Sequence, residues 1–222
     1  MVNLRQNSGV TLVEMLVVLG IIMVLSGIVA TLTLRVDNQS KENVLTNTFA
    51  LLGSALEQFH EYEYRYPPRY AEFGFPLDCD GFSVAALGTV LGEAVGATNV
   101  QITNHVRLDG REYLEYSGCE ALFFLLSQVP AVRETLSRVS PALVTGKNEE
   151  GGEIKILNNG RLEPLLRVVD PWGTTLRYDY YDVRPADVAP LPETQRTFPV
   201  LISAGPDKQF DTGDDISSKG KR

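Results

Sequence analysis

The sequence contains little of what most catalytic sites are built from. It has two histidines, His60 and His105, and neither belongs to a set of His, Cys and Asp residues with the spacing of metal ligands. No nucleophile elbow and no glycine-rich phosphate loop of either common type occurs in the chain. We therefore expect both histidines to have ordinary structural roles, and we expect that the protein is not an enzyme.

The chain also lacks positive charge. Its 222 residues carry a formal net charge of −8 at neutral pH, and no stripe of Lys and Arg offsets the acidic residues. A surface of this sign repels phosphate backbones, so we expect no nucleic acid among its partners. The length suits one domain with a real core together with one additional long element.

Charge is absent from residues 15–34, which are mostly apolar. A helix of this length is about 30 Å long and can cross a bilayer once. A secretory signal peptide is the alternative, but its apolar run is about 7–15 residues long and ends at a small-residue cleavage site. Here the run is longer, and the charged Arg35 and Asp37 follow it without such a site. We expect the segment to remain in the mature protein as an anchor.

A short motif precedes the apolar run and contains one acidic residue at its edge. A carboxylate costs about 2.5–3.5 kcal/mol at the centre of a membrane helix and less near the interface, so it normally needs a partner. The motif reads Gly9-Val10-Thr11-Leu12-Val13-Glu14. It resembles the cleavage and methylation motif of type IV prepilins and of the pseudopilins of type II secretion.

This resemblance implies a role for each motif residue. A membrane prepilin peptidase would cut after Gly9 and N-methylate Val10, which makes residues 1–9 a leader peptide. Glu14 would be an assembly residue whose carboxylate pairs with the new amine of a neighbouring subunit, since two buried charges are tolerated better as a pair. The alternative is an interfacial carboxylate at the helix start with no assembly role. The resemblance also places the N-terminus in the cytoplasm and the C-terminal head outside.

The apolar pattern continues beyond the anchor. Five apolar residues recur at spacings of four and three, namely Leu45, Phe49, Leu52, Leu56 and Phe59. We predict one helix over residues 10–64 whose second half, residues 35–65, is amphipathic and packs on a head formed by residues 66–222. Pro67 and Pro68 end this helix.

The head has the pattern of an α+β domain. Residues 73–141 form an insertion in which we predict helices near residues 85–95, 120–129 and 131–139 and a strand near residues 100–106. Residues 153–157, 176–181 and 197–202 read as strands. The predicted fold is pilin-like, with the long helix packed on one small antiparallel sheet.

The C-terminal part, residues 153–216, ends in an acidic loop. Four carboxylates lie close together in the chain, those of Asp207, Asp211, Asp214 and Asp215. Their repulsion is relieved by a hard divalent cation with oxygen ligands or by hydrogen bonds from nearby N–H groups, and both remain open. The loop and the preceding Asp-Pro-Trp-Gly turn at Asp170 resemble those of major pseudopilins, and this resemblance implies that the four aspartates bind Ca²⁺. For the turn itself we expect only that it buries Trp172.

Cys79 and Cys119 are the only cysteines, and both follow the anchor. In an exported head they can pair in one way, and the disulfide would stabilise the fold by about 3–4 kcal/mol. Two buried free thiols are the alternative.

The resemblance favours a pseudopilin that polymerises into a periplasmic pseudopilus for type II protein secretion. Its partners would be further copies of the chain, other pseudopilins, the prepilin peptidase, the inner-membrane secretion platform and the membrane itself. The chain would then be a single-pass inner-membrane protein with its head in the periplasm. A minor type IV pilin for surface adhesion or DNA uptake is the alternative, and an enzyme on the same anchor is a third.

Overall fold

The computed structural model describes residues 12–65, 71–72, 74–97, 100–158, 160–179 and 198–221, and within the first helix it describes the side chains of residues 12–26 and 36–62. The chain divides into two compact units, residues 1–42 and residues 43–222. The long helix α1, Leu12–Arg65, contributes to both. It agrees with the predicted helix, except that Val10 and Thr11 lie outside the described residues.

In the first unit, the described side chains of residues 12–26 are exposed. None of the helices, as far as their residues are described, has the length and the apolar character that crossing a bilayer requires. The membrane span predicted for residues 10–34 therefore stays a prediction.

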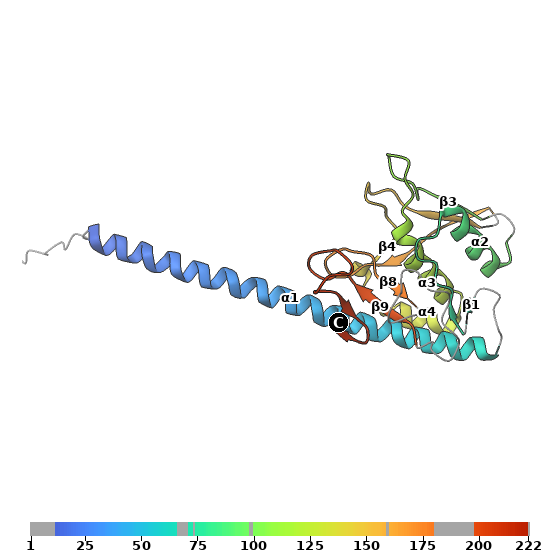
Figure 1. Ribbon diagram of the computed structural model, residues 1–222, viewed down its shortest axis with the longest axis horizontal. Helices are drawn as coiled ribbons and strands as arrows, with labels where there is room; N and C mark the ends of the chain where they lie inside the picture. Colours follow the sequence, from blue (N-terminus) through green and yellow to red (C-terminus); the bar gives the residue numbers. More distant parts are fainter. Residues whose placement is uncertain are drawn as a thin grey trace, which may run out of the picture. The chain divides into compact units, whose positions relative to one another are not determined.

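The second unit is the head, and α1 enters it with the predicted apolar stripe. Leu45, Leu52, Leu56 and Phe59 are at most 1% exposed, and Phe49 is 6% exposed. Figure 1 shows this part of α1, in cyan, running alongside the orange and red strands of the head. Because the stripe is buried, the helical periodicity read from the sequence is confirmed here.

The head continues with short helices and short strands. Its helices are α2 (Val84–Val95), α3 (Ser117–Ser127) and α4 (Pro130–Leu136), with single 3-10 turns η1 (Leu114–Tyr116) and η2 (Pro141–Leu143). The strands are β1 (Ala71–Glu72), β2 (Phe75–Pro76), β3 (Gln101–Thr103), β4 (Val144–Thr145), β5 (Lys155–Asn158), β6 (Arg161–Pro164), β7 (Arg167–Val168), β8 (Arg177–Asp179), β9 (Val200–Ser203), β10 (Ile216–Ser217) and β11 (Gly220–Lys221).

These strands form several antiparallel sheets, not the single sheet predicted. The described strands pair as β1-β2, as β11-β10-β9-β8, as β3-β5-β6 and as β4-β7. The strands predicted at residues 176–181 and 197–202 correspond to β8 and β9, which are neighbours in the four-stranded sheet, and residues 180, 181 and 197 lie outside the described residues. The strand predicted at residues 153–157 instead pairs with β3 and β6 in a separate sheet. The prediction of one sheet was therefore wrong, although α+β is the correct fold class.

The sheets are separate because the head has two hydrophobic clusters, with α3 between them. Leu122 and Leu126 of α3 pack with α1, α4 and the four-stranded sheet. Ala121 and Leu125 of the same helix pack with α2 and the three-stranded sheet. A helix that is apolar on nearly every position must be covered on more than one face, which explains the run of apolar residues in its sequence.

Candidate functional site

The residues with sequence-derived roles fall in three places along the chain. Gly9 and Val10, the predicted cleavage and methylation residues, lie outside the described residues. Glu14 lies in the first turn of α1 and is exposed. A carboxylate in this turn is favoured by the partial positive charge of the helix N-terminus. Apolar side chains surround it along the helix, and Leu12 and Leu16 are 80% and 66% exposed.

The acidic loop connects β9 to β10 and folds onto itself through its carboxylates. Asp207 accepts from the backbone N–H of Gln209 at 2.8 Å, and its own N–H donates to Asp214 Oδ2 at 3.0 Å. Asp215 Oδ2 accepts from the N–H of Asp211 at 2.8 Å. Thr212 donates to Asp214 Oδ1 at 2.6 Å, and this hydrogen bond is the main cause that lowers the pKa of Asp214. Hydrogen bonds from nearby N–H groups, which were the alternative to a cation, therefore stabilise much of the acidic loop.

The surroundings of Asp211 and Asp215 bear on whether the loop can bind a cation. The guanidinium of Arg177 lies 3.3 Å from both carboxylate oxygens of Asp211 and 4.2 Å from the ring centre of Phe210. Asp215 is 5% exposed, and its Oδ1 is buried without a hydrogen-bond partner. Across the described residues, no group of three or more His, Cys, Asp or Glu side chains has an arrangement that could hold a metal ion. Calcium binding therefore stays a prediction, with Asp215 Oδ1 as the atom that lacks a partner.

The loop is fixed to the Asp-Pro-Trp-Gly turn by a residue to which the sequence assigned no role. Asp170 is 1% exposed, and its Oδ1 accepts from the N–H groups of Trp172 and Thr174 at 3.0 and 2.8 Å. Its Oδ2 accepts from the hydroxyl of Ser203, the last residue of β9, at 2.7 Å. Burial raises the pKa of Asp170 more than these hydrogen bonds lower it. Trp172 is partly buried against the first cluster, as expected of this turn.

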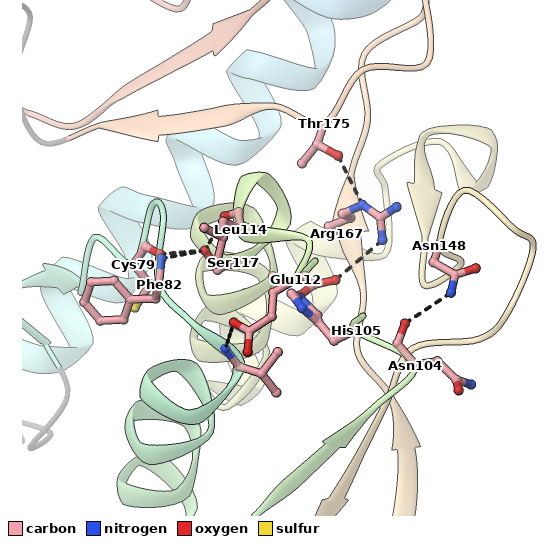
Figure 2. A network of polar contacts seen from close by, with 12 residues as sticks. Cys79, Phe82, Asn104, His105, Glu112, Leu114, Ser117, Asn148, Arg167 and Thr175 are labelled. Carbon is pink, nitrogen blue, oxygen red and sulfur yellow. Dashed lines mark hydrogen bonds and ion pairs between the residues drawn. The ribbon is translucent and has the colours of Figure 1, made fainter. Parts of the chain in front are cut away.

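A buried polar network joins α3, β7 and the segment that follows β3 (Figure 2). His105 Nε2 lies 2.8 Å from Glu120 Oε2 of α3, and Arg167 Nη1 of β7 lies 3.5 Å from the other oxygen of the same carboxylate. Arg167 also donates to the carbonyl of Lys147 at 2.6 Å and to the hydroxyl of Thr175 at 3.1 Å. The three charged or ionisable side chains are almost completely buried. Their hydrogen bonds offset part of the cost of burying them, and His105 Nδ1 is buried without a hydrogen-bond partner.

Aromatic rings cover this network. Tyr113 and Tyr116 stack with a centroid distance of 4.8 Å and an interplanar angle of 4°. Arg107 lies over the outer face of this pair at 4.4 Å, and Arg167 lies over the other face at 3.6 Å. The four side chains form a column in which each cation meets a ring face. Sequence reasoning missed this column, because Arg107 and Arg167 are far apart in the chain; the aromatic spacing of Tyr113 and Tyr116 was its only local signal.

The structure has Cys79 and Cys119 as free, buried thiols, so the predicted disulfide is absent. Cys79 packs in the second cluster and Cys119 in the first. Cys119 Sγ lies 3.3 Å from the backbone N of Val168. The two segments are joined instead by Ser117, whose Oγ lies 2.8 Å from the carbonyl oxygen of Cys79 and accepts from the N–H of Phe82 at 3.1 Å (Figure 2).

Both histidines have structural contacts, as expected. His105 belongs to the buried network, although it follows β3 and does not lie within it as predicted. His60 stacks on Phe75 with a centroid distance of 4.6 Å, and its Nδ1 lies 3.1 Å from the carbonyl oxygen of Gly74.

Comparison with known proteins identifies one region of the chain. A family model described as the prokaryotic N-terminal methylation motif matches residues 4–30. No curated protein and no solved structure matches the chain. The matched region contains Gly9, Val10 and Glu14.

Proposed function

We propose that this chain, a type IV prepilin-like protein by its N-terminal methylation motif, is a pseudopilin that polymerises into a periplasmic pseudopilus for type II protein secretion. In this proposal a prepilin peptidase cuts after Gly9 and methylates Val10. The match over residues 4–30 carries the proposal. Such motifs belong to structural subunits, so we propose that the chain acts by assembly and is not an enzyme.

The first unit supports assembly through α1. Its described apolar side chains at residues 12–26 are exposed, which leaves them available to lipid or to the same helix of other subunits. Glu14 stands among them in the first turn of the helix. In an apolar bundle its carboxylate would pair with the amine of residue 10 of a neighbour. Residues 10–34 would be the single membrane span in the inner membrane, with the head in the periplasm.

The proposed partners follow from this assembly. They are copies of the same chain, other pseudopilins, the prepilin peptidase and the inner-membrane secretion platform.

One observation favours the alternative of a minor type IV pilin for surface adhesion or DNA uptake. The second hydrophobic cluster, with α2 and the three-stranded sheet, adds a layer to the head that the packing of α1 does not require. A tip subunit could use such a layer for binding.

The test is the N-terminus and mass of the membrane-extracted protein, made with and without a co-expressed prepilin peptidase. We expect N-methylated Val10 as the first residue only when the peptidase is present. In a filament assay, Glu14→Ala should be cleaved but fail to assemble. Glu57→Ala, which removes an exposed carboxylate from the same helix, is the matched control and should assemble normally. A mature chain that keeps Met1, or that begins after residue 34, contradicts the proposal.

We further propose that the acidic loop binds Ca²⁺ through Asp207, Asp211, Asp214 and Asp215. The unpartnered Oδ1 of Asp215 supports a cation there, and hard cations prefer oxygen ligands. Millimolar Ca²⁺ should raise the melting temperature of the chain, and EDTA should reverse the effect. Asp215→Asn should abolish the response, whereas Asp109→Asn, an exposed aspartate outside the loop, should retain it. Equal melting temperatures with Ca²⁺ and with EDTA would leave the hydrogen-bonded loop as the full account.

A further inference from the structure

A groove of the head lies between α2 and β3. Its volume is about 810 Å³, which falls in the range of ligand clefts. Val84, Ala85 and Thr89 of α2 line one wall, and Gln101 and Ile102 of β3 line the other. This groove uses none of the residues to which the preceding sections assign processing, assembly or cation binding.

The elements around the groove are firmly held. Ser83 caps α2 by accepting from the N–H of Ala86 at 3.3 Å, and the carboxylate of Glu112 accepts from the N–H of Val84 at 2.8 Å. At the other end, a Cβ built at Gly92 would lie 3.1 Å from the carbonyl oxygen of Ala97 and 3.3 Å from Val100 Cγ2. Gly92 and Gly88, where a Cβ would lie 3.5 Å from the carbonyl oxygen of Val100, therefore allow α2 to lie close to Val100, the residue before β3.

One wall of the groove is a strand edge that pairs with no other strand of the described residues. β3 is the end strand of the sheet β3-β5-β6, where it pairs with β5 alone. Figure 2 shows α2, in mint green at the lower left, on the side of β3 away from the tan strands. Among the described residues, no backbone hydrogen bond joins α2 or another segment to this outer edge. An exposed edge presents N–H and C=O groups in the arrangement that an added strand requires.

The acidic side chains that line the groove favour an incoming strand with basic side chains. Glu93 and Glu112 are the charged residues that line the groove, and in the described part of the chain neither forms an ion pair. Basic side chains on an incoming segment would meet these carboxylates. The small, exposed residue Ala85 leaves space on the helix wall for the alternate side chains of an extended chain, whereas a Cβ at Gly88 would contact the carbonyl oxygen of Val100 at 3.5 Å.

We propose that this groove binds an extended basic segment of another polypeptide, which adds to the outer edge of β3 as a further strand. The backbone of the segment pairs with β3, its apolar side chains face α2 and Ile102, and its Lys or Arg residues meet Glu93 and Glu112. The proposal does not depend on filament assembly, because α1 contributes nothing to the groove.

Fluorescence anisotropy of dye-labelled peptides with the full-length chain in neutral detergent tests this binding. The probe is acetyl-Lys-Val-Lys-Val-Lys. Its acidic counterpart, with Glu in place of Lys, and a version with Pro at the second Val are the comparisons. Each should bind at least about tenfold more weakly, because one lacks charge complementarity and the other lacks a backbone donor. Hydrogen exchange should slow at residues 101–103 when the basic peptide is bound.

Three variants locate the site. Thr89→Trp fills the groove from an exposed helix position and should abolish binding. Glu93→Lys should weaken binding of the basic peptide by about tenfold, since a repulsive pair replaces an attractive one. Glu134→Lys, the same change at an exposed position of α4, should bind as the unaltered chain does and controls for general charge attraction.

Three outcomes overturn the proposal. The first is equal binding of the proline-containing peptide, which would exclude strand addition. The second is binding that survives both Thr89→Trp and Glu93→Lys, which would place the peptide elsewhere. The third is displacement of the peptide by the unlabelled chain itself, with loss of that self-association in Thr89→Trp, which would identify the occupant as a second copy.

Discussion

The hydroxyl of Ser203 donates a 2.7 Å hydrogen bond to Oδ2 of the buried Asp170. This contact joins the turn before β8 to the end of β9, where the acidic loop begins. The Ser203 Oγ also accepts from the N–H of Gly205 at 3.1 Å, so one carboxylate supports the first turn of the loop. The Asp-Pro-Trp-Gly turn therefore has a second role besides placing Trp172.

Replacing Asp170 by Ala should destabilise the head by about 2–4 kcal/mol, because the buried hydroxyl of Ser203 and the partly buried N–H groups of Trp172 and Thr174 lose their acceptor. Urea denaturation followed by tryptophan fluorescence measures the change. Asp109→Ala is the control, since its partner Arg111 is exposed and the loss should stay below about 1 kcal/mol. A loss of that small size in Asp170→Ala would mean that water replaces Asp170 at no cost.

Asp170 also makes a prediction for pH. Burial raises the pKa of this carboxyl above its unfolded value, so between the two values the folded state binds more protons than the unfolded state. The stability that the Asp170 carboxyl contributes is fully present below its pKa in the unfolded chain. It is lost as pH rises through its pKa in the folded chain. The stability of the unaltered chain relative to Asp170→Asn should therefore fall as pH is raised above the usual carboxyl range. A difference that rises with pH would contradict the raised pKa.

Gly205→Ala should cost about 2–4 kcal/mol because two constraints act together. The residue has a φ of 67°, and an added Cβ would overlap the carbonyl oxygen of Asp214 and lie 3.0 Å from its carbonyl carbon. Gly213→Ala in the same loop is the matched control, because a Cβ there meets nothing within 4 Å. Equal denaturation midpoints for the two variants would show that the loop relaxes without cost.

Arg167→Met should destabilise the head by about 3–5 kcal/mol, because Glu120 would stay buried without its cation. Arg161→Met removes an exposed arginine and should change stability by at most about 1 kcal/mol. The double variant Arg167→Met with Glu120→Leu should recover part of the loss, and its measured coupling separates the ion pair from the packing on Tyr116. Additive effects would exclude an interaction between Arg167 and Glu120.

The free thiols make a prediction about reduction. Burial raises the pKa of both Cys79 and Cys119 to about 12, so neither should react with iodoacetamide in the native chain near neutral pH. Both should react after unfolding, and dithiothreitol should leave the melting temperature unchanged. Mass spectrometry under denaturing conditions counts the modified thiols. A chain that takes up label only after reduction would contain the disulfide that the structure lacks.

Sequence reasoning succeeded where one local period decides the structure. The apolar stripe from Leu45 to Phe59 lies on one helix, so its spacing alone identifies the buried face. The helix predicted at residues 85–95 agrees with α2, which a serine cap begins and Gly96 in a left-handed conformation ends. The short strands were placed less well. β6 and β7 were not predicted, because two to four residues carry too little alternation to be recognised.

The sequence by itself determined the N-terminal methylation motif and the long helix, because both depend on residues close together in the chain. Only the tertiary structure decided which strands share a sheet, that Cys79 and Cys119 stay unpaired, and that His105, Glu120 and Arg167 meet in one buried network. Those outcomes depend on how α3 is covered from two sides. Contacts between residues 47 positions apart, such as Arg167 with Glu120, leave no periodic signal in a single sequence.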